Sequence, residues 1–256
     1  MSITLDLNCD MGESYGAWTM GNDAAILPFV SSANIACGYH GGDPATMRRT
    51  VAAALEHGVA LGAHPSLPDL VGFGRRPMQI SPQEAYDMVV VQVGALAGVA
   101  ASQGARLHHV KAHGALYNMA AKDGALARAI CTAVRDVDAE LVLYGLAGSQ
   151  WVDAAQGAGL QLAQEVFADR SYQDDGSLTP RTQAGAMITD VDQAVAQVLH
   201  MVQQRAVTSL NGKRVPLEPD TLCLHGDQPD ALAFATAIRA ALEQAGITVR
   251  APGKRR

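Results

Sequence analysis

Six apolar segments of the sequence each end in an aspartate or a histidine. These end residues are Asp10, His40, His64, His113, Asp169 and His225. If the segments are parallel β-strands, all of these side chains emerge at one edge of one sheet. Burying many titratable groups together is costly unless they are paired or bind a metal. We therefore predict that they form a catalytic or metal-binding centre.

Two carboxylates lie close together after the first segment. Asp10 and Glu13 flank Gly12, which lets the backbone turn so that both side chains face one point. A pair of this kind suits a general base or a hard metal ion. We predict catalytic roles for both residues, and the alternative for Asp10 is a loop-capping role.

His64 and His113 each end a later segment of the chain. With the Asp10 carboxylate they would supply two nitrogens and one oxygen, which suits Zn²⁺ or another divalent transition metal. The alternative for either histidine is a hydrogen-bonded core residue. We expect no functional role for three other histidines, namely His57, His108 and His200.

His40, Lys111 and His225 are further candidate catalytic residues. His40 lies among three glycines just before a predicted helix, a pattern that forms a backbone concavity for an anion. Lys111 lies two residues before His113, so both side chains share one face of a strand. A lysine on a buried face is either paired with a carboxylate or has a lowered pKa, and both are common in catalytic sites.

Arginines in two predicted loops suit an anionic substrate, because the guanidinium fork pairs with carboxylate or phosphate. Arg75 and Arg76 lie in the loop after the third strand, and Arg170 lies at the start of the loop after the sixth. A solvated surface role is the alternative for each of them. The predicted substrate-binding residues are Asn8, Arg75, Arg76, Asp169, Arg170 and Asp227.

Strands and helices must alternate along the chain to position these residues. Strands are expected at 3–8, 33–37, 59–63, 107–112, 141–144, 160–166 and 222–224. Helices are expected at 44–57, 82–103, 123–137, around Trp151, at 190–204 and at 229–244. Such alternation requires a parallel sheet with crossover helices.

The predicted fold is an α/β barrel, distorted, with seven or eight strands. The stretch at 207–219 could hold an eighth strand, but it carries Asn211-Gly212 and two prolines. An irregular or incomplete barrel is therefore favoured over a closed eightfold barrel, and an open doubly wound sheet is the alternative. In both folds chemistry takes place at the carboxyl ends of the strands.

The length of 256 residues fits one barrel domain, which we expect to span 1–256 with a disordered basic tail at 251–256. The net charge of −6 argues against a nucleic-acid partner. The apolar stretches are interrupted too often for a membrane span, and no signal peptide is visible. We therefore expect a cytoplasmic protein.

Six ordered motifs closely resemble the LamB/YcsF family of bacterial 5-oxoprolinase subunits. They are DLNCDMGE at 6–13, ANIACGYHGGDP at 33–44, GAHPSLPD at 62–69 with GFGRR at 72–76, VKAHGALYN at 110–118, EVFADRSY at 165–172 and CLHGD at 223–227. The family usually has proline where this chain has Ala112, which we expect to loosen that strand end slightly and to leave the role of His113 unchanged.

The resemblance implies ATP-dependent opening of the lactam 5-oxo-L-proline to L-glutamate, together with two partner subunits. It also implies a barrel of the glycoside hydrolase/deacetylase type, in which Asp10, His64 and His113 hold a divalent metal. The sequence has no G-x-x-x-x-G-K-[ST] motif, so the ATP site is either unrecognisable here or on a partner.

Two other functions remain open at this point. One is a stand-alone metal-dependent deacetylase or amidohydrolase, and the other is a non-catalytic subunit that binds the lactam for its partners. The oligomeric state is open as well, a homo-oligomer included.

Overall fold

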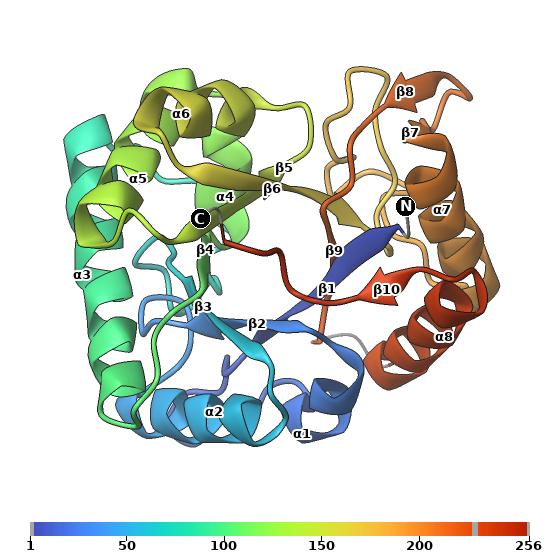
Figure 1. Ribbon diagram of the computed structural model, residues 1–256. Helices are drawn as coiled ribbons and strands as arrows, with labels where there is room; N and C mark the ends of the chain where they lie inside the picture. The colour runs from blue at the N-terminus through green and yellow to red at the C-terminus, as the bar shows by residue number, and fades with distance from the viewer. Residues whose placement is uncertain (1–2, 227–229, 255–256) are drawn as a thin grey trace.

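The computed structural model describes residues 3–226 and 230–254, and within them a parallel barrel encloses the centre of the molecule (Figure 1). Its strands are β1 (Thr4–Met11), β2 (Ser32–Ala36), β3 (Ala60–His64), β4 (His109–Lys111), β5 (Val142–Leu146), β6 (Gln161–Phe167) and β9 (Thr221–Leu224). They pair in that order, and β9 pairs again with β1, with Asp6 opposite Thr221. The barrel is therefore closed.

Helices surround the barrel on the outside, as Figure 1 shows. They are α1 (Asp23–Ile26), α2 (Pro44–Glu56), α3 (Pro82–Ala101), α4 (Gly114–Ala120), α5 (Gly124–Val137), α6 (Gln150–Ala158), α7 (Val191–Gln204) and α8 (Ala231–Gln244), with a 3₁₀ turn at Leu27–Phe29. Asp43 caps α2 by accepting from the backbone N–H of Ala45 at 2.9 Å, and Ser81 forms a capping box with Glu84 at the start of α3.

The α/β barrel expected from the sequence is confirmed, and the stretch at 207–219 differs from the expectation. It forms an antiparallel hairpin of β7 (Ala206–Thr208) and β8 (Arg214–Pro216) beside the barrel. Asn211-Gly212 lies at its turn, where Gly212 has a φ of 81°. Among the described residues seven strands close the barrel, so it is neither incomplete nor an open doubly wound sheet.

The helix α3 is long and apolar enough by composition to cross a membrane. It packs against α5 and β3, however, and its buried side chains include Val89, Val93 and Leu96. These contacts make it a covering helix of the barrel, and a single helix of this kind is weak support for a membrane span.

The barrel interior is polar, which is unusual for a small barrel. Alternate residues of β1 point inward, so Asp6, Asn8 and Asp10 form a buried column. Gly62 leaves room for His109, because a Cβ at Gly62 would lie 2.0 Å from His109 Nε2. Buried polar groups of this number must bond to one another.

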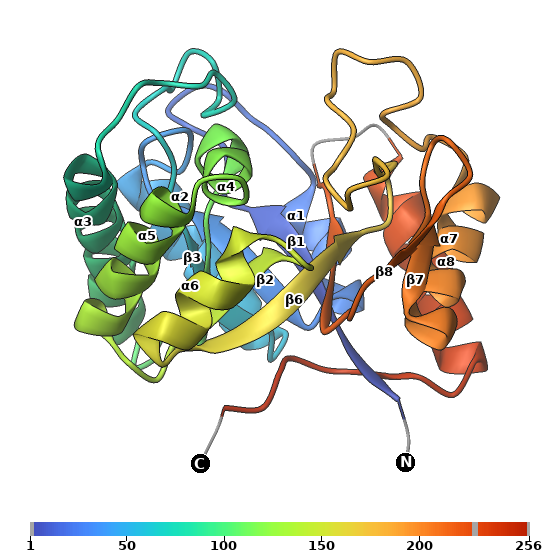
Figure 2. The same ribbon diagram turned by 90° about the horizontal axis from the view of Figure 1, so that it is seen from above.

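The long loops lie at the carboxyl ends of the strands, and both chain ends lie at the opposite end (Figure 2). There β10 (Thr248–Val249) pairs with the start of β1. His108 Nε2 donates to the carbonyl of Pro252 at 2.8 Å, and Gln161 donates to that of Gly253 at 2.7 Å. Residues 251–254 of the predicted tail are thus described and carry these bonds, whereas residues 255 and 256 lie outside the described residues. The disorder of the tail stays a prediction.

Candidate active site

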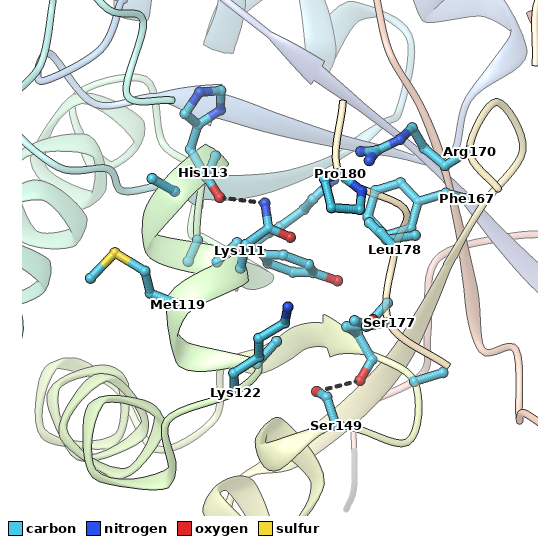
Figure 3. A pocket seen from close by; sticks show the side chains of 18 of the residues that line it. Lys111, His113, Met119, Lys122, Ser149, Phe167, Arg170, Ser177, Leu178 and Pro180 are labelled. Carbon is cyan, nitrogen blue, oxygen red and sulfur yellow. Dashed lines mark hydrogen bonds between the residues drawn. The ribbon is translucent and has the colours of Figure 1, made fainter. Parts of the chain in front are cut away.

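A pocket of about 1280 Å³ opens at the carboxyl ends of the strands. Asp10, Glu13, His64, Lys111 and His113 line its inner part. In Figure 3, His113 and Lys122 lie on the side of α4, and Arg170 and Phe167 lie on the opposite side. Four of the six predicted strand-end residues line this pocket, namely Asp10, His64, His113 and His225. His40 and Asp169 do not line it, but they contact Glu13 and His225, which do.

Asp10 uses its two carboxylate oxygens differently. Oδ1 accepts hydrogen bonds from Lys111 Nζ at 3.0 Å and from Asn34 Nδ2 at 2.9 Å. Oδ2 lies 3.3 Å from His64 Nε2. Burial alone would raise the pKa of Asp10, but His64 and Lys111 outweigh it and hold this pKa well below its usual range. Asp10 is therefore a fixed anion and a poor general base.

His64 and His113 each use one ring nitrogen to bond to a carbonyl and point the other ring nitrogen at each other. His64 Nδ1–H donates to the carbonyl of Lys111 at 2.7 Å, and His113 Nε2–H donates to that of Phe73 at 2.8 Å. In neutral rings the remaining nitrogens, His64 Nε2 and His113 Nδ1, carry lone pairs, and they lie 3.0 Å apart. Two facing lone pairs are unfavourable unless a proton or a cation lies between them.

Glu13 and His40 complete this cluster. Glu13 Oε1 lies 3.2 Å from His40 Nε2 and 3.6 Å from His113 Nδ1. The rings of His40 and His113 stack with their centroids 3.7 Å apart. Burial lowers the pKa of His40, and the neighbouring His113 and His64 lower it further. Burial likewise lowers the pKa of His113, so His40 and His113 are held in the neutral form, which binds metals.

This donor set fits a divalent metal ion. The ligand atoms of Glu13, His40, His64 and His113 lie within 4.8 Å of one another. Donors around one tetrahedral ion at about 2.1 Å are about 3.4 Å apart, close to the separations seen here. This group differs from the expected set of Asp10, His64 and His113: it keeps both histidines, adds Glu13 and His40, and leaves out Asp10. Asp10 instead contacts His64 and belongs to a second donor group with Cys223 and His225.

His225 and Asp169 form a separate acid–base pair in the same pocket. His225 Nδ1–H donates to Asp169 Oδ2 at 2.8 Å, which leaves Nε2 as the acceptor nitrogen of a neutral ring. Arg181 Nη2 lies 3.3 Å from that nitrogen. Burial alone would raise the pKa of Asp169, but His225 holds it below its usual value. An aspartate that orients a histidine in this way is typical of proton transfer.

The three predicted arginines have different environments. Arg170 lines the pocket, is 6% exposed, and donates through Nη2 to the carbonyl of Thr179 at 2.5 Å. Its Nε has no hydrogen-bond partner among the described residues. Arg75 also lines the pocket and lies over the ring of Phe73. Arg76 pairs with Asp69 and does not line the pocket.

The remaining predicted substrate-binding residues are Asn8 and Asp227. Asn8 is buried beneath the pocket floor, where it bonds to Thr221 at 2.7 Å and to Glu165 at 3.1 Å. Asp227 falls outside the described residues. The sequence interpretation also missed Glu165 and Asn34. Both lie inside strands, and the only signal was a polar residue in an apolar run.

Comparisons with known proteins agree with this geometry. A family profile described as the LamB/YcsF family matches residues 5–256. The chain is 75% identical over 251 residues to a 5-oxoprolinase subunit of Bordetella pertussis, covering 98% of this chain and 100% of that protein.

Among solved structures, the chain is similar to the lactam utilization protein from Thermus thermophilus, with a TM-score of 0.93 and 49% identity over 98% of this chain and 100% of that one. It is also similar to a family 4 carbohydrate esterase from Streptomyces lividans, with a TM-score of 0.50 and 14% identity over 96% of this chain and 91% of that one. The second likeness shows the fold alone.

Proposed function

Because the chain belongs to the LamB/YcsF family, we propose that it is the lactam-opening subunit of an ATP-dependent 5-oxoprolinase. The substrate is 5-oxo-L-proline and the product is L-glutamate. The names of the relatives, a 5-oxoprolinase subunit and a lactam utilization protein, support this assignment. The observation that carries it is the meeting of a metal-type donor cluster and an acid–base pair in one pocket.

Substrate binding is assigned to the arginines of the pocket. The lactam carries a carboxylate, and the buried Arg170 offers a guanidinium whose Nε donates to no described residue. Arg75 adds positive charge from the loop after β3. Arg76 and Asn8, which do not line the pocket, support the site indirectly in this proposal. Asp227 stays a prediction.

Ring opening adds one water molecule across the amide bond. The water oxygen bonds to the carbonyl carbon, the carbon–nitrogen bond breaks, and the ring nitrogen gains a proton. His225, oriented by Asp169, is the group that we assign to proton transfer at the nitrogen. Asp10 and Lys111 keep their charges during the reaction, and their ion pair holds the inner wall of the pocket in place.

A divalent metal would be held by Glu13, His40, His64 and His113, with Asp10 beside His64. When bound, such an ion would polarise the carbonyl oxygen and lower the pKa of a coordinated water. Metal analysis of the purified chain before and after chelation tests this assignment. A metal-free protein with full activity would contradict it.

ATP is assigned to a partner subunit, because the sequence carries no phosphate-binding loop motif. The cytoplasmic location and any homo-oligomer stay predictions. The test is to assay glutamate release by the isolated chain and by the chain with its partner subunits, each with and without ATP. We expect activity only in the complete mixture with ATP.

The other candidate functions give different outcomes in the same assay. Strong glutamate release by the isolated chain without ATP would overturn the proposal. Deacetylation by the isolated chain with added metal would favour a stand-alone deacetylase. Full activity of the complex after replacement of Asp10 and His225 would indicate a non-catalytic binding subunit.

A further inference from the structure

Glu165 is a fully buried carboxylate that lies behind the pocket wall. It sits on β6, is 0% exposed and does not line the pocket. Its Oε1 lies 2.8 Å from Lys111 Nζ and accepts a hydrogen bond from Asn8 Nδ2 at 3.1 Å. It therefore reaches the reaction centre only through other residues.

Lys111 Nζ lies between carboxylates from two different strands. Glu165 of β6 is on one side, and Asp10 of β1 accepts from Nζ at 3.0 Å on the other. Asn8 Oδ1 at 3.2 Å and Cys223 Sγ at 3.0 Å complete its surroundings. Because the lysine stem is flexible, these contacts decide where the ammonium stands.

The position of the ammonium in turn fixes Asp10. With Oδ1 bound by Lys111 and Asn34, Oδ2 is directed to His64 Nε2 at 3.3 Å. If Lys111 moved, Asp10 would lose the contact that sets this rotation. The orientation of a carboxylate at a metal-type donor cluster commonly depends on outer partners of this kind.

Lys111 is the cation that pairs with Glu165 inside the barrel. Glu165 Oε2 has no well-aligned hydrogen-bond donor among the described residues, and the hydroxyl of Tyr117 is the nearby group that can approach the carboxylate. Tyr117 is near enough that burial and the Glu165 carboxylate together raise its pKa well above the usual value. A buried carboxylate with so few donors is strongly destabilised when its cation is removed.

From this arrangement we infer that Glu165 is a positioning residue for the lactam-opening reaction: it holds Lys111 so that Asp10 presents Oδ2 to the histidine cluster. The inference rests on the proposed function, and it adds a residue from outside the pocket to that site.

The test compares Glu165→Gln, Lys111→Met and the double variant in the complex with partner subunits and ATP. Asp6→Asn is the matched control, because Asp6 is also a buried carboxylate on an inward position of the barrel and does not line the pocket. For E165Q we expect kcat to fall by about 10-fold to 100-fold. KM should stay unchanged, since Glu165 does not reach the pocket.

The kcat of the double variant and the melting temperatures distinguish a positioning role of Glu165 from a merely structural role. In the double variant kcat should be no lower than in K111M alone, because Glu165 acts through Lys111. D6N should lower the melting temperature and leave kcat of the folded protein unchanged. Should E165Q fail to fold, E165D keeps the charge and shortens the side chain, and it should likewise lose kcat with KM unchanged.

The outcomes distinguish this inference from the proposed function. If Asp10→Asn is inactive while E165Q keeps its kcat, the inference fails and the function stands. Fully multiplicative losses in the double variant, or a loss of kcat in D6N equal to that in E165Q, also overturn the inference. If the wild-type complex releases no glutamate, or D10N is fully active, the proposed function itself fails.

Discussion

Asp10 contacts Lys111 through one carboxylate oxygen and His64 of the histidine cluster through the other. Replacing it with asparagine removes the anion while keeping the side-chain shape. We expect Asp10→Asn to lower turnover at least about 100-fold, because it removes the carboxylate that contacts His64 of the donor cluster. The fold should survive, because Lys111 keeps Glu165 as a counter-ion. Turnover of the reconstituted complex and a melting curve check both parts, and unchanged turnover or a collapse of stability would make Asp10 structural.

The second prediction concerns the role of His225 in proton transfer. Asp169 orients the His225 ring through Nδ1, and Nε2 faces Arg181. For His225→Gln we expect turnover to fall about 100-fold or more, the typical contribution of a general acid or base. His200→Gln is the control, because His200 is exposed on α7. Equal turnover in both variants would remove His225 from the proton-transfer role.

The loop after β3 positions the histidines through its backbone. Gly74 has a φ of 61°, and a Cβ there would lie 2.2 Å from Ser66 Oγ and 2.8 Å from His113 Cδ2. Gly16 has a similar φ of 57° with nothing within 4 Å of such a Cβ. We expect Gly74→Ala to lower turnover at least about tenfold by displacing His113, whereas Gly16→Ala adds only backbone strain. Turnover and melting temperature of the two variants should be compared, and equal turnover would show that the loop tolerates the change.

The sequence allowed prediction of the elements and strand ends, and less of the residues between them. The positions of Asp10, His64 and His113 followed from parallel topology, which brings strand ends together. Glu165 and Asn34 were missed, because a polar residue within a strand points into the barrel or to solvent depending on register. Arg75 and Arg76 are neighbours in one loop, and only the folded loop separates them.

At the scale of the whole molecule, buried neutral histidines make stability depend on pH. Burial lowers the pKa of His40, His109 and His113 well below the unfolded value of about 6.5. Below that pH the unfolded chain binds more protons, so the free energy of unfolding falls as pH falls, by up to about 1.4 kcal/mol per pH unit for each histidine. Asp10, with its low folded pKa, acts in the same direction at more acid pH, while Asp6, whose pKa burial raises, opposes it.

We therefore expect urea midpoints to fall between pH 7 and pH 5, measured with a chelator present so that metal binding does not contribute. His109→Gln should reduce this pH dependence, because it removes one buried imidazole outside the donor cluster. His57→Gln, at the exposed end of α2, should leave it unchanged. Midpoints that stay constant over this range would contradict the prediction.

The pairing of β1 with β9 joins the first strand of the barrel to its last strand. This has a consequence for synthesis on the ribosome. Asn8 bonds to Thr221 across 213 positions and to Glu165 across 157, and Lys111 bonds to Cys223 across 112. Until β9 has left the exit tunnel, the charges of β1 and β4 have no closed interior to enter and stay hydrated. A nascent chain that stops before β9 therefore has neither a sealed barrel nor a pocket. Reactivity and stability are acquired together, in one late step, and a partner subunit that recognises the finished pocket would select complete chains.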